Sequence, residues 1–199
     1  GRTRAFLKIQ DGCDNFCSYC IIPFARGRLR SRQKEAILQE VHQLVDAGFQ
    51  EIVLTGIHTG GYGRDLGNYS FTDLVKDILK EEPRLYRLRI SSIEESEITD
   101  ELISLMKTNT VIDHHLDMPI LSGSNGVLKR MNRKYDVNTF LSKVKAIRRI
   151  IPDVALTTDV IVGFPGETEE EFNETVKTLK EADFSMLHVF PFSARSGTP

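Results

Sequence analysis

Short apolar runs alternate with stretches of helical period along the whole chain, and this alternation constrains the fold most. The clearest pair is the β-branched run 154–163, followed by a helix start in which Thr168 and Glu171 match a capping box. The other expected strands are 5–10, 51–56, 86–92, 115–120 and 187–192, and the other expected helices are 33–47, 71–82, 99–109 and 137–150. Strands that alternate with helices of this length indicate parallel βαβ units with right-handed crossovers.

The number of these units limits the architecture. Six strands and five helices fit into 199 residues, whereas a closed eight-unit barrel typically needs about 250. The pattern therefore favours an α/β fold with an open or partial barrel, and a doubly wound sheet remains an alternative. In both architectures ligands bind at the carboxyl ends of the strands.

Composition narrows the class of protein. With 40% hydrophobic and 27% charged residues the chain can bury one core, and its net charge of −2 provides no overall cationic field, so binding of nucleic acid would depend on local basic clusters. No run of about 18 apolar residues and no secretory signal occur, so we expect a cytoplasmic protein without membrane contact. The chain starts at Gly1 and ends in "SGTP", which suggests a piece of a longer protein.

All three cysteines, Cys13, Cys17 and Cys20, lie within eight residues. An odd number with such short gaps makes a poor disulfide framework, and soft thiolate ligands favour zinc, cuprous copper or an iron–sulfur cluster. A structural zinc ion usually has four ligands, and the nearest histidine, His42, lies within an expected helix. Three thiolates on a four-iron cluster would leave one iron open, which suggests catalysis. A zinc site and unligated thiols remain alternatives.

The CxxxCxxC spacing, with Tyr19 directly before the last cysteine, resembles the signature of the radical S-adenosylmethionine (SAM) superfamily. This resemblance implies a partial (βα)6 TIM-like barrel, open on one side, and a [4Fe–4S] cluster on the three cysteines. The open iron would bind the amino and carboxylate groups of SAM. One electron, from a donor such as flavodoxin or ferredoxin, would then cleave SAM to methionine and a 5′-deoxyadenosyl radical.

Six further blocks resemble the radical methylthiotransferases: "GCDNFCSYCIIPFARGRLRSR", "EIVLTGIHTGGYG", "RLRISSIE", "PILSGSNGVLKRMNRKY", "TTDVIVGFPGETEEEF" and "HVFPFSARSGTP". "LTGIHTGGYG" and "RISSIE" are most similar to the enzymes that act on N6-threonylcarbamoyladenosine at position 37 of tRNA. Enzymes for isopentenyladenosine tRNA or ribosomal protein S12 are alternatives, and a zinc-stabilised RNA-binding module without catalysis is an alternative of another class. The family implies that residues 1–199 are the radical SAM core, without the N-terminal domain that carries a second [4Fe–4S] cluster and the C-terminal RNA-binding domain.

Several positions outside the cysteines match cofactor-binding motifs of this family. Tyr19 is expected on the adenine side of SAM. The other expected SAM contacts are Gly56, Ser91, Glu94, Arg133, Gly163 and Phe164, with Ser92 beside them, although glycines and serines at strand ends also form ordinary turns. Leu121 replaces the family's usual glutamine, and Ser122 or Ser124 could compensate for it. Among the histidines, only His58 lies in a glycine-rich loop on the expected active face.

Basic residues follow the cysteines at every second position, namely Arg26, Arg28, Arg30, Arg32 and Lys34. An extended segment would place all five on one face, which suits phosphates. We expect the four arginines to bind RNA, with a tRNA anticodon loop rather than DNA as the partner, and a share in cofactor binding or a plain solvated surface is the alternative. A second basic cluster, Lys129, Arg130, Arg133 and Lys134, is expected near the same site.

Overall fold

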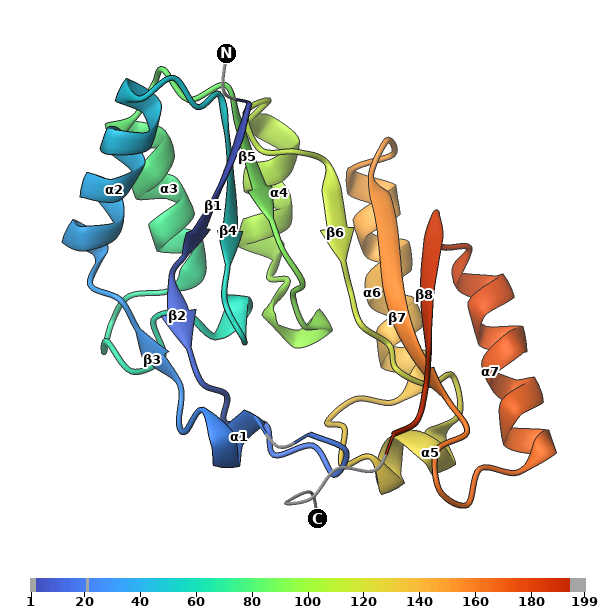
Figure 1. The fold of residues 1–199 in the computed structure, drawn as a ribbon. Helices are drawn as coiled ribbons and strands as arrows, with labels where there is room; N and C mark the ends of the chain where they lie inside the picture. Colours follow the sequence, from blue (N-terminus) through green and yellow to red (C-terminus); the bar gives the residue numbers. More distant parts are fainter. Residues whose placement is uncertain (1–2, 21, 194–199) are drawn as a thin grey trace.

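The computed structural model describes residues 3–20 and 22–193, and its centre is a set of six parallel strands. Three neighbouring strands, here called the first half-barrel, are β1 (Arg4–Lys8), β4 (Glu51–Thr55) and β5 (Arg87–Ile90). The second half-barrel consists of β6 (His115–Asp117), β7 (Ala155–Val162) and β8 (Met186–Pro191). A parallel bridge between Leu88 and Ile112 joins the halves. Among the described residues β1 and β8 do not pair, so the predicted partial, open barrel is confirmed (Figure 1).

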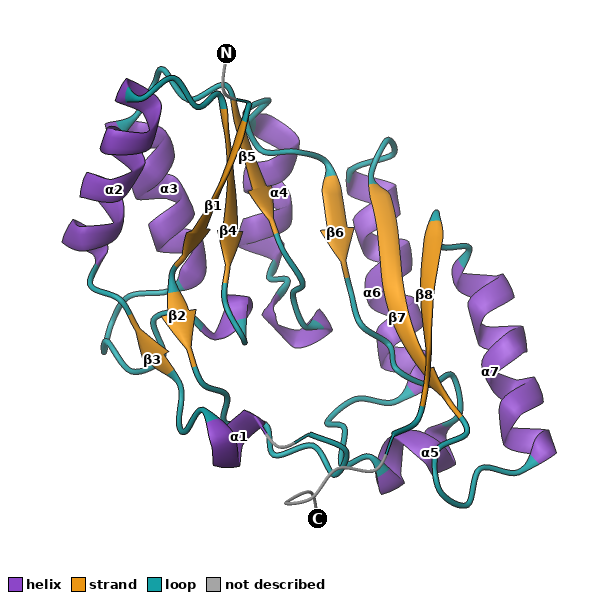
Figure 2. Ribbon diagram, viewed as in Figure 1, coloured by secondary structure: helices purple, strands orange, loops and turns teal. Residues whose placement is uncertain are grey.

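Five helices cover the outer side of the strands, as expected (Figure 2). They are α2 (Lys34–Asp46), α3 (Phe71–Glu81), α4 (Asp100–Thr108), α6 (Val137–Ile150) and α7 (Glu169–Ala182). The Thr168 hydroxyl accepts from the Glu171 N–H, and the Glu171 carboxylate accepts from the Thr168 N–H, which confirms the capping box. Alternate strand residues such as Leu7 and Leu54 are fully buried against these helices, which produces one continuous core.

Four short elements have too few residues for a periodic signal and were not expected. They are the antiparallel pair β2 (Gln10–Asp11) and β3 (Arg30–Ser31), and the helices α1 (Ile22–Ala25) and α5 (Asn125–Arg130). Two 3-10 turns, Thr59–Gly61 and Glu95–Glu97, follow β4 and β5. The expected strand 115–120 ends early, because Pro119 has no N–H to donate to a ladder.

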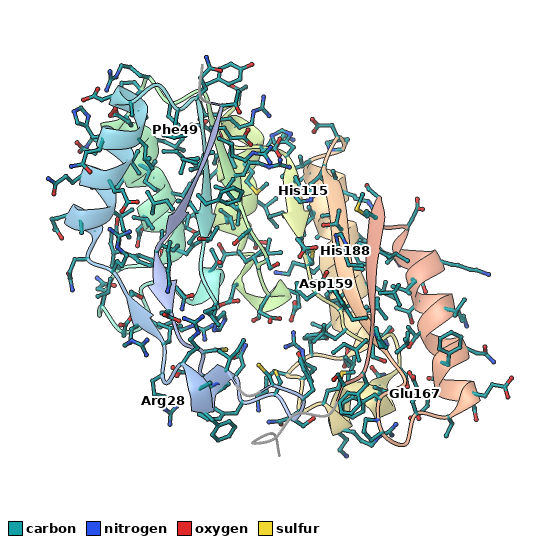
Figure 3. The ribbon with its side chains drawn as sticks, viewed as in Figure 1. Arg28, Phe49, His115, Asp159, Glu167 and His188 are labelled. Atoms are coloured by element: carbon teal, nitrogen blue, oxygen red, sulfur yellow. The ribbon has the colours of Figure 1, made fainter. Side chains whose placement is uncertain are left out.

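The inner side of the partial barrel carries charged pairs beside apolar side chains such as Phe6. Arg4 pairs with Glu51 at 3.3 Å, and Arg89 pairs with Asp113 at 3.0 Å. Nearer the carboxyl ends of the strands, Asp159 on β7 is in register with His188 on β8 (Figure 3). None of the helices among the described residues is long and apolar enough to cross a membrane.

A candidate cofactor site at the cysteine loop

The cysteine loop, residues 12–20, follows β2 at the carboxyl ends of the strands (Figure 1). Its first residue, Gly12, has a φ of +75°, and a Cβ there would lie 2.1 Å from the carbonyl oxygen of Arg28, so only glycine fits without distortion. The Cys13 N–H donates to the Gly27 carbonyl at 3.2 Å. The Gln10 amide donates to the Gly12 carbonyl at 3.0 Å. The start of the loop is thus fixed to the first half-barrel.

The end of the loop is attached to the second half-barrel, more than a hundred residues further along the chain. The Ser18 N–H donates to the Met131 carbonyl at 3.0 Å, and its hydroxyl donates to the Arg130 carbonyl at 2.8 Å. The Asn132 amide donates to the Phe16 carbonyl at 3.0 Å. The cysteine loop therefore spans from one half-barrel to the other.

All three cysteines line one cavity with a volume of about 240 Å³. No three Cys, His, Asp or Glu side chains among the described residues are grouped closely enough to hold a single metal ion. Thiols that surround one cavity at a distance from each other suit a four-iron cluster, in which each thiolate binds a different iron. Burial raises the pKa of the Cys20 thiol, and a metal would displace its proton. The donor set and the shared cavity therefore fit the cluster.

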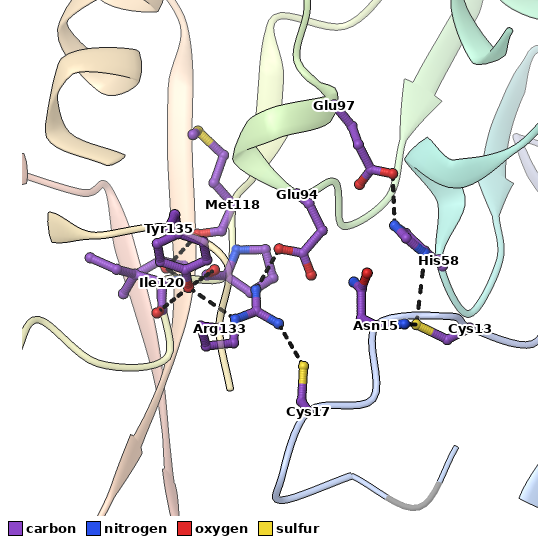
Figure 4. Close-up of polar contacts among 12 residues, drawn as sticks. Cys13, Asn15, Cys17, His58, Glu94, Glu97, Met118, Ile120, Arg133 and Tyr135 are labelled. Carbon is purple, nitrogen blue, oxygen red and sulfur yellow. Dashed lines mark hydrogen bonds and ion pairs between the residues drawn. The ribbon is translucent and has the colours of Figure 1, made fainter. Parts of the chain in front are cut away.

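Arg133 lies on the wall of this cavity and contacts a cysteine directly (Figure 4). Its Nη1 is 3.2 Å from Cys17 Sγ and 3.3 Å from the Tyr19 hydroxyl, and its Nη2 is 2.5 Å from Glu94 Oε2. Burial alone would lower the pKa of Arg133, but Tyr135 and Glu94 raise it above its usual range. A permanent cation with only 6% of its side chain exposed can hold an anionic group in this cavity.

On the opposite side of the loop, His58 lies between Cys13 and Glu97 (Figure 4). Its Nδ1 is 3.7 Å from Cys13 Sγ, and its Nε2 is 2.7 Å from Glu97 Oε2. Burial opposes protonation, but the contacts with Cys13 and Glu97 prevail and raise the pKa of His58 to about 9. The backbone N–H of His58 donates to Gln10 Oε1 at 2.7 Å. This bond attaches the loop after β4 to the strand that leads into the cysteines.

The structure brings only part of the predicted cofactor site into the cavity. The residues that line it are the three cysteines, Tyr19, Glu94 and Arg133, together with Asn15, Phe16, Ile22, Pro23, Ile57, Pro119, Leu121 and Asp159. Ser91 and Ser92 are not among them, because their hydroxyls contact Thr59 Oγ1 at 2.9 Å and Asp117 Oδ2 at 2.7 Å. Gly56 does not line the cavity either, although the next residue, Ile57, does.

Gly163 and Phe164 lie just beyond the cavity. Gly163 has a φ of +73°, and its N–H donates to Glu167 Oε1 at 2.8 Å. The Phe164 ring packs edge to face on Phe192, with ring centroids 5.2 Å apart, in a small apolar cluster against which Tyr19 also packs. This cluster supports Tyr19 from behind.

Leu121 lines the cavity in the left-handed backbone region, with a φ of +67°. Its backbone bonds to β7, as its N–H donates to the Asp159 carbonyl at 2.9 Å and its carbonyl accepts from Ile161 at the same distance. Ser122 and Ser124 are buried away from the cavity, and the Ser122 hydroxyl lies 3.2 Å from Thr175 Oγ1. Neither serine is positioned to replace the glutamine that the family resemblance predicts in place of Leu121.

Asp159 is a lining residue that the sequence did not single out. Burial raises the pKa of its carboxyl, and the nearby carboxylate of Asp117 raises it further. The signal was available, since a charged residue in the middle of a β-branched strand must face a polar space. Asp159 is the acidic group on the β7 side of the cavity.

The basic residues after the cysteines do not form one extended stripe, because the segment is extended only at Arg30–Ser31 and Lys34 already belongs to α2. Each arginine instead faces a carboxylate. Arg26 and Arg30 lie 3.4 Å and 3.8 Å from Asp11, Arg28 lies 3.7 Å from Asp14, and Arg32 lies 2.9 Å from Glu40. Arg26, Arg28 and Arg30 still expose more than half of their side chains.

Two curated tRNA-modifying enzymes match the whole chain. The chain is 57% identical over its whole length to the threonylcarbamoyladenosine tRNA methylthiotransferase MtaB of Bacillus subtilis, and 44% identical to the tRNA-2-methylthio-N(6)-dimethylallyladenosine synthase of Desulfitobacterium hafniense. It spans 44% of the length of each of these relatives.

Solved structures with low sequence identity share the fold. The radical SAM methyltransferase TsrM of Kitasatospora setae, solved with cobalamin and a [4Fe–4S] cluster bound, is 18% identical and has a TM-score of 0.76 over 94% of this chain and 36% of its own. Coproporphyrinogen III oxidase HemN of Escherichia coli, a radical SAM enzyme, is 16% identical and has a TM-score of 0.69 over 96% of this chain and 44% of its own. Residues 7–179 match the radical SAM superfamily, whose cofactors are a [4Fe–4S] cluster and SAM. The chain therefore belongs to the radical SAM superfamily.

Proposed function

We propose that this chain is the core of a tRNA methylthiotransferase that converts N6-threonylcarbamoyladenosine at position 37 to its 2-methylthio derivative. The observation that carries the proposal is the 57% identity to MtaB over the full length of the chain. A dimethylallyladenosine synthase is 44% identical, and the MtaB proteins of Thermotoga maritima and Chlamydia pneumoniae are 45% and 44% identical. The preference for the threonylcarbamoyl substrate therefore rests on the higher identity to the Bacillus subtilis enzyme. The three thiols around one cavity favour a cluster enzyme over a zinc-stabilised RNA-binding module.

Within the cavity each group has a proposed role. Cys13, Cys17 and Cys20 would hold the cluster. When bound, the cluster and SAM supply a 5′-deoxyadenosyl radical. Arg133, a buried cation beside Cys17, would bind the carboxylate of SAM, and its present partner Glu94 would turn to the amino group or the ribose. Tyr19 and the apolar cluster behind it would form the wall against the adenine ring.

We propose that the substrate RNA lies over the arginines next to the cysteine loop. The exposed ends of Arg26, Arg28 and Arg30 are available to phosphates, and Arg32 lies at the edge of the same surface. An anticodon loop suits an open barrel, because its unstacked bases can reach into a recessed site. A tRNA substrate in turn implies a cytoplasmic enzyme.

The full reaction requires parts that lie outside these 199 residues. We propose that residues 1–199 are one radical SAM core domain, that an N-terminal domain with a second cluster supplies sulfur, and that a C-terminal domain assists in binding RNA. A small electron carrier such as flavodoxin or ferredoxin would reduce the cluster. The reconstituted fragment should then cleave SAM without methylthiolating tRNA, and methylthiolation by the fragment alone would contradict this division.

The decisive experiment offers the full-length, reconstituted enzyme three substrates in parallel: tRNA with threonylcarbamoyladenosine, tRNA with isopentenyladenosine, and ribosomal protein S12. Mass spectrometry of the nucleosides and of the protein identifies the product. We expect a methylthio group only on threonylcarbamoyladenosine, and its loss when Cys17 is replaced by alanine. A product on either other substrate would refute the proposed specificity.

A further inference from the structure

His58 and Glu97 form a buried pair directly beside one of the cysteines. Their side chains are only 4% and 5% exposed, and His58 Nε2 lies 2.7 Å from Glu97 Oε2. The other ring nitrogen, Nδ1, lies 3.7 Å from Cys13 Sγ, within reach of an N–H···S hydrogen bond (Figure 4). The two residues come from the loops after β4 and β5, so the pair forms only in the folded barrel.

The surroundings fix the position of this imidazole. The backbone N–H of His58 donates to Gln10 Oε1. The side-chain amide of Gln10 in turn donates to the carbonyl of Gly12, one residue before Cys13. The 3-10 turn Thr59–Gly61 wraps closely around the ring, since a Cβ at Gly61 would lie 3.1 Å from its Nδ1. Arg64 Nη2 lies 3.0 Å from Glu97 Oε2 and holds the carboxylate from the outer side.

Both neighbours of the ring are acceptors, the Glu97 carboxylate 2.7 Å from Nε2 and, with the cluster bound, the Cys13 thiolate 3.7 Å from Nδ1, so the ring suits both only with a hydrogen on each nitrogen. The contact with Glu97 is an ion pair outside hydrogen-bond geometry, and its charge holds the cationic ring in place. Nδ1 faces a sulfur atom, which as a thiolate is an acceptor. We propose that His58, oriented by Glu97, is a positioning residue that donates a hydrogen bond to the Cys13 thiolate and thereby raises the reduction potential of the cluster. Hydrogen bonds to ligand sulfur are among the factors that set cluster potentials, because reduction adds negative charge that a donor stabilises.

The proposal rests on the cluster occupying the cysteine cavity, and it does not depend on which substrate is methylthiolated. It is tested on the full-length, reconstituted enzyme by a redox titration followed by electron paramagnetic resonance. SAM distinguishes the two expected clusters, because it would bind in the cavity of Cys13, Cys17 and Cys20 and perturb the signal of the cluster there. His58→Leu removes the donor, Glu97→Gln keeps the donor but removes the anchoring charge, and His114→Leu is the matched control.

His114 suits the control because it also pairs with a carboxylate, Asp153, at 2.9 Å, but does not line the cysteine cavity. We expect His58→Leu to lower the equilibrium constant for cluster reduction by about tenfold, which is about 59 mV for a one-electron couple. Glu97→Gln should shift the potential in the same direction by less, and His114→Leu should leave it unchanged. Pulsed electron paramagnetic resonance of the enzyme labelled with 15N-histidine should show a weak coupling between the reduced cluster and a histidine nitrogen. His58→Leu should abolish this coupling.

Iron content and absorbance establish that each variant carries its cluster. If His58→Leu does not retain the cluster, the reduction potential of Glu97→Gln tests the proposal instead. An unchanged potential in the cluster-loaded variants, or a wild-type enzyme without the histidine coupling, would overturn the role of His58 and leave the methylthiotransferase assignment intact. A wild-type enzyme that takes up no iron would overturn both.

Discussion

The carboxamide of Gln10 occupies the space that a side chain at Gly56 would need. A Cβ at Gly56 would lie 2.3 Å from Gln10 Oε1, far inside van der Waals contact. The same carboxamide accepts from the His58 N–H and donates to the Gly12 carbonyl. The glycine at the end of β4 is thus required by the packing that holds the cysteine loop, in addition to any contact with SAM.

Replacing Gly56 by alanine should push Gln10 out of place and loosen the cysteine loop. Overpacking of this kind typically costs about 1–3 kcal/mol. We expect a lower denaturation midpoint and fewer irons per chain after reconstitution. The double variant Gly56→Ala with Gln10→Ala separates the causes, since the alanine should cost less where the carboxamide is missing. An equal cost in both backgrounds would show that Gln10 is not the obstacle.

Replacing Arg133 by glutamine should weaken the binding of SAM. The guanidinium is buried beside Cys17 and Glu94, and its removal takes away the proposed carboxylate partner and leaves Glu94 without its cation. We expect the dissociation constant for SAM, measured by equilibrium dialysis on the cluster-loaded enzyme, to rise at least tenfold. Arg149→Gln, at an exposed position on α6, should have no effect. Unchanged SAM binding in the Arg133 variant would exclude the proposed role.

Replacing Leu121 by glutamine introduces the residue that the family resemblance predicts here and places an amide in the cavity. Leucine and glutamine both have to adopt the left-handed backbone conformation at this position. The substitution therefore changes the polarity of the side chain without changing the backbone strain. We expect a severalfold gain in SAM affinity and a small loss of stability, since Leu121 packs against Val127, Met131 and Phe164. Calorimetric titration and thermal denaturation measure the two effects. A weaker affinity for SAM would mean that the cavity requires an apolar group here.

The arginines after the cysteine loop should determine the salt dependence of tRNA binding. Replacing Arg28, which has 75% of its side chain exposed, by glutamine should weaken binding to the full-length enzyme and reduce the slope of log K against log salt by about one. Arg149→Gln serves again as the control. A slope that stays the same in the Arg28 variant would remove this surface from the RNA interface.

Replacing Asp11 by asparagine should have the opposite effect on RNA. Asp11 neutralises Lys8, Arg26 and Arg30 at distances of 2.7, 3.4 and 3.8 Å, so its loss frees cations for phosphates and should tighten tRNA binding. The hydrogen bond from Lys8 lowers the pKa of Asp11, so its ionic contribution to stability exists above the unfolded pKa and disappears as the pH falls through the folded value. Asp11→Asn should therefore destabilise the protein at neutral pH but not in strong acid.

The periodic part of the fold follows from the sequence. The helices from Phe71 and Val137 begin where the apolar pattern places them, because each buries a single stripe against the strands. The antiparallel pair Gln10–Asp11 and Arg30–Ser31 could not be found this way, since two residues contain no period. The same pair bends the arginine segment and prevents the single stripe that alternation suggested.

The site divides in a similar manner. Cysteine spacing made Cys13, Cys17 and Cys20 the candidate cluster ligands, and a position near the cysteine loop made Arg133 a candidate for SAM binding. The contact between His58 and Glu97 joins residues 39 positions apart on two irregular turns, so no local pattern encodes it. Leu121 shows the same limit, because its left-handed backbone is imposed by bonding to β7 and not by a preference of leucine.

The cysteine loop, attached at Gly27 on one side and at Met131 on the other, sets the width of the barrel mouth. The half-barrels cannot spread apart at this end without moving the three ligands relative to each other. A cofactor that fixes the spacing of those ligands consequently restricts the movement of the two half-barrels relative to each other. Cofactor binding and the stability of this end of the barrel are then thermodynamically linked. A bound cofactor stabilises the arrangement of the half-barrels, and a more stable arrangement binds the cofactor more tightly.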